Sequence, residues 1–229
     1  MDNLTKHQSN LSLNDKEGGK MCLKKERSSN EHTIAAKFLM KRALNTDAIV
    51  RTFSPLWHSI NGFKVHNIGD HTILFVFYNN EEVEKNLASE PWSFDRHLVV
   101  LQRLEIASLV CGLAFNMVSI WFQVHNIPVS YLNRGVTEEQ CEVIGEMDRT
   151  STNAEVEGGS FIKVRVRVNV SLPQCAGLVL SIEDGKEGWV SFKFERLPNI
   201  CYWCGCLYHA NRDCDLWIES DGTLDISDQ

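Results

Sequence analysis

Residues 62–90 read GFKVHNIGDHTILFVFYNNEEVEKNLASE, and three secondary-structure elements are predicted within this stretch. Gly62–Ile68 and His71–Tyr78 are expected to be strands, because the Gly-Asp pair at 69–70 is typical of a hairpin turn. Asn80 can cap the helix that follows, and the two glutamates after it suit the positive end of a helix. The stretch therefore predicts a strand, a second strand and a helix in direct succession.

The neighbouring segments complete a larger unit. Thr33–Phe38 is predicted to be a strand, followed by a helix over Leu39–Phe53 that ends at Pro55. His97–Leu104 is predicted to be the last strand. The resulting order is β-α-β-β-α-β, which is the order of the ferredoxin-like fold and of RNA-recognition (RRM) modules.

A β-rich segment follows this unit. Strands are predicted at Val118–Val124, Phe161–Val170, Leu178–Ile182 and Trp189–Phe194. Thr137–Glu146 is predicted to be a helix, because Thr137 and Gln140 have the spacing of a capping box. We therefore expect an α+β protein with a ferredoxin-like (RRM-like) domain and a β-rich extension.

Residues 201–214 read CYWCGCLYHANRDC and contain ligands with the spacing of a metal site. The predicted zinc ligands are Cys201, Cys204, His209 and Cys214. Three thiolates and one imidazole complete a tetrahedral zinc shell with no position left for water, so the predicted role of the single zinc ion is structural. Gly205 permits the tight turn beneath the sulfurs. Buried thiols and a redox Cys-x-x-Cys pair are the alternatives; the clustering argues against the first, and the second lacks the flanking strand and helix of a thioredoxin-type site.

Aromatic and basic side chains near this segment are candidates for nucleic-acid contacts. Tyr202 and Trp203 could stack unpaired bases, although Trp203 could instead pack on the preceding domain. Arg212 is the cation inside the segment. Three more cations lie on one face of the predicted strand 161–170, where they form either a phosphate-binding row or a solvated face: Lys163, Arg165 and Arg167.

Two further aromatic residues occupy the strand where an RRM keeps its base-stacking rings. Phe75 and Phe77 alternate onto one face of His71–Tyr78, and the other face of this strand is also apolar. Two apolar faces indicate that both are covered. We therefore favour the protein core for these rings and keep base stacking as the alternative.

Composition and charge narrow the class of protein. The chain has 229 residues, of which 43% are hydrophobic and 23% charged, as in an ordinary globular protein. The net charge of -7 argues against nucleic-acid binding when it is considered alone. However, residues 215–229 carry five acidic and no basic residues, so most of the excess negative charge lies in the last fifteen positions. The eight cysteines, without an export signal or an apolar membrane span, predict an intracellular protein of the nucleus or cytoplasm that is not secreted.

Most of the chain resembles a known plant family. The matching stretches are GDHTILFVFYNNEEVEKNLASEPWSFDRHLVVLQRLE (69–105), VSIWFQVHNIPVSYLN (118–133), FIKVRVRVNVSLP (161–173) and WVSFKFERLPNICYWCG (189–205). With the Cys-x2-Cys-x4-His-x4-Cys segment, they resemble the plant domain of unknown function 4283 family in its branch with a C-terminal CCHC zinc knuckle. Members resemble capsid-like parts of LINE-type retrotransposons, so the resemblance implies zinc binding, nucleic-acid binding and a retroelement origin.

Two positions depart from the family pattern. Family knuckles usually have Gly before the histidine, where this chain has Tyr208, and a basic residue where it has Cys206. A positive φ at the first position would strain a tyrosine, and the second change removes a phosphate contact. Both departures predict weaker nucleic-acid binding with zinc binding retained.

These observations lead to one main hypothesis and one alternative. The chain is expected to be a zinc-dependent protein of retroelement origin that binds single-stranded nucleic acid, RNA in preference to DNA. It is expected to have no catalytic residues and no enzymatic activity. Neither a small-molecule substrate nor a membrane is expected as a partner. The alternative is a domesticated protein–protein interaction module with a purely structural zinc. The expected organisation is a disordered segment (1–30), the ferredoxin-like domain (31–106), the β-rich extension (107–198), the CCHC knuckle (199–214) and an acidic disordered tail (215–229).

Overall fold

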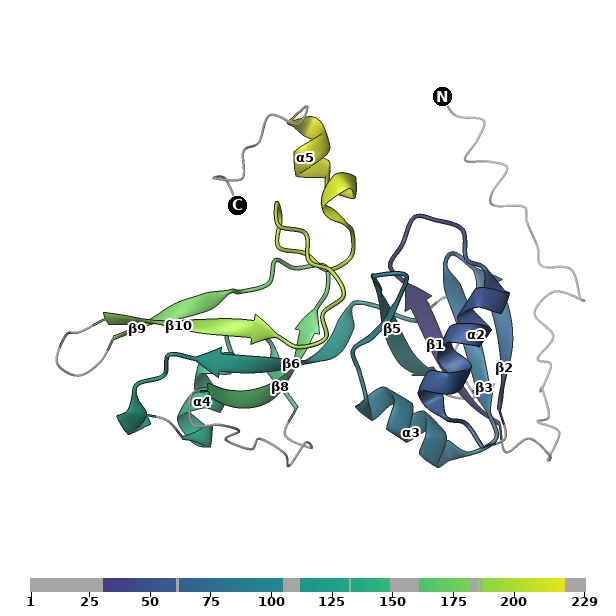
Figure 1. Cartoon of the computed structure of the whole chain (residues 1–229), viewed down its shortest axis with the longest axis horizontal. Helices are drawn as coiled ribbons and strands as arrows, with labels where there is room; N and C mark the ends of the chain where they lie inside the picture. Colours follow the sequence, from purple (N-terminus) through teal and green to yellow (C-terminus); the bar gives the residue numbers. More distant parts are fainter. Residues whose placement is uncertain are drawn as a thin grey trace, which may run out of the picture. The chain divides into compact units, whose positions relative to one another are not determined.

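A computed structural model of the chain describes residues 31–60, 62–104, 112–131, 133–148, 161–181, 185 and 187–220. This part of the chain has an α+β fold made mostly of strands, which form two antiparallel five-stranded sheets (Figure 1). The expected disordered segment 1–30 lies outside the described residues, and so does the end of the expected tail, 221–229. None of the described helices is long and apolar enough to cross a membrane.

The first sheet has the strand order β2-β3-β1-β5-β4, with every neighbouring pair antiparallel. Its strands are β1 (His32–Phe38), β2 (Phe63–Gly69), β3 (Thr72–Phe77), β4 (Trp92–Phe94) and β5 (His97–Leu104). Its helices, α2 (Thr46–Trp57) and α3 (Asn80–Ala88), supply buried side chains to the core on one face of the sheet (Figure 1). The edge strand β4 was not predicted from the sequence.

Helix α2 differs at both ends from the predicted helix over Leu39–Phe53. It begins after Asn45, whose Oδ1 accepts a hydrogen bond from the N–H of Ala48 at 3.0 Å, so the residues before it form a loop. Pro55 lies inside the helix two residues before its end, where its missing N–H removes a single bond of the last turn. Both predicted boundaries were wrong: the cap at Asn45 was not recognised, and Pro55 was predicted to end the helix but does not.

Aromatic rings dominate the core of the first sheet. The ring of Trp57 lies with its centroid 4.7 Å from those of both Phe53 and Phe75. Phe75 and Phe77 are fully buried. Their rings therefore pack in the core, and β3 does not present them for base stacking.

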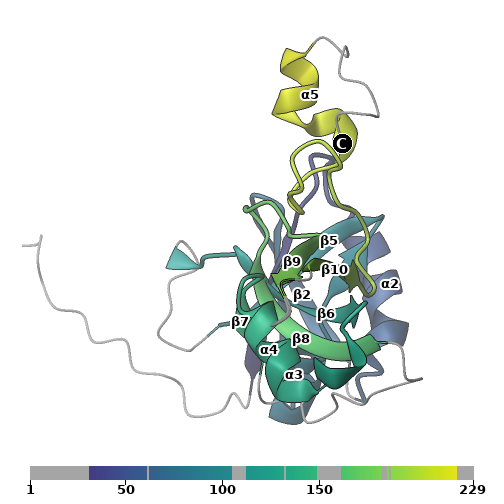
Figure 2. The same ribbon diagram turned by 90° about the vertical axis from the view of Figure 1, so that its left-hand side faces the viewer.

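The second sheet has the order β7-β8-β6-β10-β9 and is also antiparallel. Its strands are β6 (Met117–His125), β7 (Glu146–Met147), β8 (Phe161–Asn169), β9 (Gly177–Ser181) and β10 (Glu187–Phe194). The short helix η2 (Val129–Tyr131) precedes α4 (Arg134–Cys141), which contacts β8 (Figure 2). The predicted capping box is wrong, because Thr137 lies within α4 and its hydroxyl donates to the carbonyl of Asn133 at 2.8 Å.

The two sheets contact each other through β5. Its residues Leu98 and Val100 are buried in the core of the second sheet, and Ala35 of β1 is also fully buried. Glu90, just before β4, accepts a hydrogen bond at Oε2 from the N–H of Ser119 in β6 at 3.3 Å. The face of the first sheet away from its helices is therefore covered along β5.

Glu90 is a buried acid at this contact. Glu90 is only 9% exposed, and its Oε1 has no hydrogen-bond partner among the described residues. Burial raises the pKa of Glu90 to about 7, although backbone N–H groups and the nearby Arg165 favour the charged form. The folded chain thus holds a proton on Glu90 more tightly than the unfolded chain does.

We predict that Glu90→Gln stabilises the protein selectively at higher pH. Because the folded pKa is raised, the native free energy of unfolding should fall as the pH rises from about 4.5 to about 7. Glutamine cannot ionise, so the variant should be more stable than the native chain by about 1–3 kcal/mol at pH 8 and should lose this advantage near pH 4.5. Urea unfolding across this range measures the difference, with the exposed Glu187→Gln as control. Parallel curves for native and Glu90→Gln protein would contradict the assignment.

Candidate metal centre

The segment that begins at Cys201 turns sharply after its second cysteine. The N–H of Gly205 donates to the carbonyl of Cys201 at 2.7 Å, and the N–H of Cys201 donates to the carbonyl of Cys206 at 2.9 Å. Gly205 has a φ of 73°, a conformation that side chains disfavour. A Cβ there would also lie 3.3 Å from Gln174 N and from Pro173 Cβ. The turn predicted at Gly205 is thus confirmed.

Four side chains converge at this turn: Cys201, Cys204, His209 and Cys214. Their ligand atoms all lie within 4.8 Å of one another, and Cys204 Sγ is 3.4 Å from His209 Nε2. Two ligands of one tetrahedral zinc, with bonds of about 2.3 and about 2.0 Å, are separated by about 3.5 Å. His209 Nδ1 has no hydrogen-bond partner in the described part of the chain, so it can carry the ring proton while Nε2 binds the metal. The donor set therefore fits one structural zinc ion.

Burial determines the protonation of these ligands in the absence of metal. It raises the pKa of the Cys201 thiol to about 11 and also raises that of Cys204. Burial raises the pKa of Cys214 as well, but the backbone N–H of Trp217 and the thiol of Cys201 lower it overall. Burial lowers the pKa of His209, which favours the neutral imidazole. Zinc must therefore displace protons from the thiols of Cys201 and Cys204, whereas His209 is favoured in its neutral form.

The metal-binding segment is joined to the second sheet by its own backbone. The N–H of Leu207 donates to the carbonyl of Val170 at 3.1 Å, and the N–H of Gln174 donates to the carbonyl of Gly205 at 2.9 Å. Leu207 is only 3% exposed and belongs to the core of the second sheet. The chain that leaves β8 thus forms the support on which the metal ligands rest.

The side chains predicted to contact nucleic acid inside this segment differ in exposure. Tyr202 is 61% exposed, and its backbone N–H donates to Asn211 Oδ1 at 2.8 Å. Trp203 stacks on Trp217, with ring centroids 4.8 Å apart and an interplanar angle of 18°. The Arg212 side chain is 83% exposed. Tyr202 and Arg212 are therefore accessible, whereas one face of Trp203 is already covered by an aromatic ring.

The basic residues of β8 share one side of the strand but differ in their partners. Lys163 forms an ion pair with Glu195 at 2.7 Å. Arg165 is buried, and its Nε lies 3.4 Å from Asp148 Oδ2. Arg167 is exposed. Two of these three cations are therefore committed to carboxylates within the protein.

Sequence reasoning missed several residues around the metal centre. The short helices η3 (Asn211–Asp213) and α5 (Asp215–Glu219) enclose the last ligand, and α5 carries Trp217 in the segment expected to be a solvated tail. An aromatic residue three positions after Cys214 was the available signal. Tyr208 is not among the described residues with positive φ, so the departure from glycine causes no backbone strain there.

Two protein families match this chain, one over the first sheet and one over the metal-binding segment. Residues 26–107 match the family described as domain of unknown function (DUF4283), and residues 180–216 match the family described as zinc knuckle. An uncharacterized protein of Arabidopsis thaliana is 25% identical over 137 residues, which is 56% of this chain and 40% of the relative. The chain thus matches less than half the length of that relative. No solved structure is significantly similar.

We predict one zinc ion per chain, which His209→Ala releases. The variant leaves three thiolates and an open position, so it should contain less than one zinc after dialysis and unfold at a lower temperature. Cys206→Ser is the control, because Cys206 lies beside the cluster but outside the four converging ligands, and it should retain its metal. Atomic absorption and thermal unfolding measure both effects. Full zinc in His209→Ala, or equal melting temperatures with and without chelator, would contradict the assignment.

We also predict that zinc affinity rises with pH. The raised pKa of Cys201 keeps this thiol protonated at neutral pH without metal, so binding must release at least one proton. The apparent affinity should increase at least about tenfold per pH unit between about 6 and 8. Competition with a chelator of known pH dependence measures this slope. An affinity that does not change with pH would show that the thiols are already ionised.

Proposed function

Because the chain carries a DUF4283 domain and a C-terminal zinc knuckle, we propose that it binds single-stranded nucleic acid through the knuckle, in a zinc-dependent manner and without catalysis. The observation that carries the proposal is the closed cluster of three cysteines and one histidine, with exposed aromatic and basic side chains at its surface. Knuckles of this kind bind unpaired bases by stacking and phosphates by charge.

Tyr202 and Arg212 are the residues of the knuckle best placed for these contacts. Tyr202 is exposed and lies between two zinc ligands, so its ring can accept a base without moving the metal site. Arg212 extends into solvent, where it can pair with a phosphate. Trp203 could contribute once Trp217 moves aside. On β8, Arg167 is available for a phosphate, while Lys163 and Arg165 would first have to leave their carboxylates.

We propose RNA as the preferred polymer, since zinc knuckles belong to the modules that read unpaired RNA bases. We also assign the first sheet to the ferredoxin-like class. The supporting observation is that β3 lies between β1 and β2, with β5 on the other side of β1. The pairing of a DUF4283 domain with a knuckle supports a retroelement origin.

We also propose that the protein acts inside the cell, in the nucleus or cytoplasm, as a binding protein and not an enzyme. Six of its cysteines lie among the described residues, and all six are free thiols. Free thiols at this density suit a reducing compartment. A zinc ion with four protein ligands stabilises the fold and has no position left for a water molecule that could take part in hydrolysis.

A second candidate function is protein–protein interaction with a purely structural zinc. The exposed apolar residues of α5 favour it, because Leu216 is 52% and Ile218 53% exposed beside the Trp203–Trp217 stack. A partner protein could cover these side chains. The ion pairs of Lys163 and Arg165 also favour this alternative, since they reduce the number of cations available to phosphates.

We predict that Tyr202→Ala weakens binding of the zinc-loaded chain to a single-stranded 12-nucleotide RNA. Loss of one base–aromatic stack should cost about 1–3 kcal/mol, or roughly 5- to 150-fold in affinity. Tyr202→Phe should bind like the native chain, because the ring is kept. Fluorescence anisotropy at several salt concentrations measures affinity, and native binding should weaken steeply with salt.

The control is Tyr78→Ala, which removes a tyrosine that is 44% exposed on the first domain and should leave RNA affinity unchanged. Single-stranded DNA and duplex RNA of the same sequence test the preferred polymer. No detectable binding of the native chain at low salt would rule out the nucleic-acid proposal and leave protein interaction as the function.

A further inference from the structure

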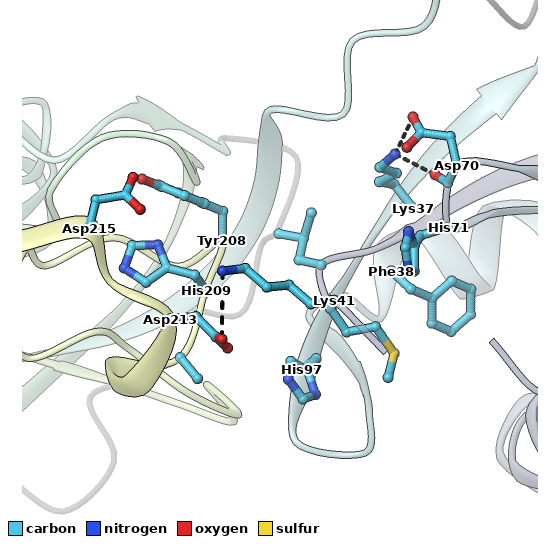
Figure 3. A pocket seen from close by; sticks show the side chains of 13 residues that line it. Lys37, Phe38, Lys41, Asp70, His71, His97, Tyr208, His209, Asp213 and Asp215 are labelled. Carbon is cyan, nitrogen blue, oxygen red and sulfur yellow. Dashed lines mark hydrogen bonds and ion pairs between the residues drawn. The ribbon is translucent and has the colours of Figure 1, made fainter. Parts of the chain in front are cut away.

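A cleft of about 490 Å³ lies where the knuckle meets the end of β1 (Figure 3). The first domain lines it with residues of β1, the loop after β1, the β2–β3 turn and the start of β5. The other side is lined by Tyr208, His209, Ala210 and Asp213 of the knuckle and by Asp215 at the start of α5. In Figure 3, Lys41 extends across this space to Asp213, whereas Lys37 is turned toward Asp70; His71 and His97 line the side of the first domain. The cleft therefore combines basic side chains of the first domain with the aromatic and acidic side chains of the knuckle.

The two lysines of the cleft have different roles. Lys37 has a side chain only 21% exposed and donates to the carboxylate of Asp70 at 2.7 Å as well as to the backbone carbonyl of the same residue. This lysine is committed to holding the β2–β3 turn. Lys41 has a side chain 69% exposed, and in Figure 3 it extends toward the knuckle. Lys41 is thus the cation of the cleft that a ligand can reach.

One carboxylate of the knuckle lies between two exposed cations. Asp213 Oδ1 is 3.6 Å from Lys41 Nζ, and Asp213 Oδ2 is 4.0 Å from Arg212 Nε. The group of three carries a net charge of about +1 at neutral pH. The Asp213 side chain is 25% exposed, but both cations are largely exposed and the N–O distances are long. Such pairs contribute little stability, so an incoming anion can replace the carboxylate at small cost. Asp213 therefore occupies a position that suits a phosphate.

We propose that one nucleotide of the bound strand docks in this cleft, with its phosphate at the edge of the cleft, between Lys41 of the DUF4283 domain and the exposed Arg212 beside Asp213. The proposal rests on the nucleic-acid function proposed above and adds a contribution from the first domain. It also gives Asp213 a role, because its carboxylate competes with the phosphate for the same two cations. The chain would then bind with the domain and the knuckle together.

Tyr208 provides the surface for the base of this nucleotide. Tyr208 is 43% exposed and lines the cleft. Its ring contacts the ring of the zinc ligand His209 edge-on, with 4.3 Å between the ring centroids. Figure 3 shows the tyrosine pointing toward Asp215, whose negative charge disfavours a phosphate at that end. Phosphate and base are therefore separated within the cleft, with the phosphate on the Lys41 side.

The charge contacts are tested by the salt dependence of RNA binding. Lys41→Gln should lower the slope of log K against log salt by about 0.7, the value for one phosphate contact on a single strand. The matched control is Lys64→Gln, which removes an exposed lysine of β2 in the same domain that pairs with Glu31 at 2.8 Å. This control should leave the slope unchanged. The probe is the single-stranded 12-nucleotide RNA, and zinc content and melting temperature verify that each variant is folded.

The competing carboxylate is tested by Asp213→Asn. This change frees Lys41 and Arg212, so binding should strengthen several-fold. Its control is Asp95→Asn, which removes an exposed acid 4.0 Å from Arg42 and alters the net charge equally. If Lys41 and Arg212 bind the same phosphate, the double variant Lys41→Gln/Arg212→Gln should change log K by less than the sum of the two single changes, because both cations act on one group.

The aromatic contact is tested by Tyr208→Ala beside Tyr208→Phe. The alanine variant should lose affinity with an unchanged salt slope, since stacking releases no counterions, and the phenylalanine variant should bind like the native chain. If native RNA binding is strong but Lys41→Gln and Lys64→Gln have the same slope, the cleft assignment is overturned and the knuckle proposal stands. If the native chain does not bind RNA, both proposals fail.

Discussion

The attachment of the knuckle to the second sheet is the constraint on which the functional surface depends. Two backbone hydrogen bonds join the segment around Gly205 and Leu207 to the chain that leaves β8, and Leu207 is buried in the core. A knuckle on a flexible linker would present its aromatic residues in any direction. Here the metal ligands have a fixed position relative to β8, and the cleft beside Lys41 exists because of it. Zinc binding and the folding of the second sheet are therefore coupled, since each holds the same residues in place.

Acidic side chains are already paired with several of the basic residues discussed above. Lys163, Arg165 and Lys41 each have a carboxylate partner, at distances between 2.7 and 3.6 Å. In the proposed complex with nucleic acid, these pairs within the protein would be exchanged for pairs with phosphate, so the electrostatic gain on binding would be smaller than a count of cations indicates. The expected result is moderate affinity with a strong contribution from stacking. The net charge of -7 therefore lowers affinity without deciding the class of partner.

The features that were predictable from the sequence are those encoded by local spacing. The alternation of Ile162, Val164 and Val166 identified β8 and its buried face, and the ligand spacing in 201–214 identified the metal centre. Features that depend on partners far away in the chain were not predictable. The ion pair of Arg165 with Asp148 joins β8 to the end of β7, so the predicted row of cations gave no sign that one member is buried.

Competing local signals explain the errors in the helices. Asn45 is a residue type that can begin a helix, and Pro55 is one that can end it. The sequence alone does not show which of the two residues marks a real boundary. In the structure Asn45 caps α2, and burial of Trp57 extends the helix past the proline, because a large aromatic side chain in the core outweighs one missing hydrogen bond.

The substitution of glycine by Tyr208 also gains a different meaning from the structure. On family pattern alone it predicts a weakened knuckle, since glycine is favoured where φ is positive. Tyr208 does not adopt a positive φ, so the tyrosine has no conformational cost of that kind. Its ring adds exposed aromatic surface beside His209 and in the cleft shared with the first domain. A departure that was predicted to reduce binding at the knuckle therefore enlarges its exposed aromatic surface, which is the surface proposed to receive a base, at the point where the two parts of the chain meet.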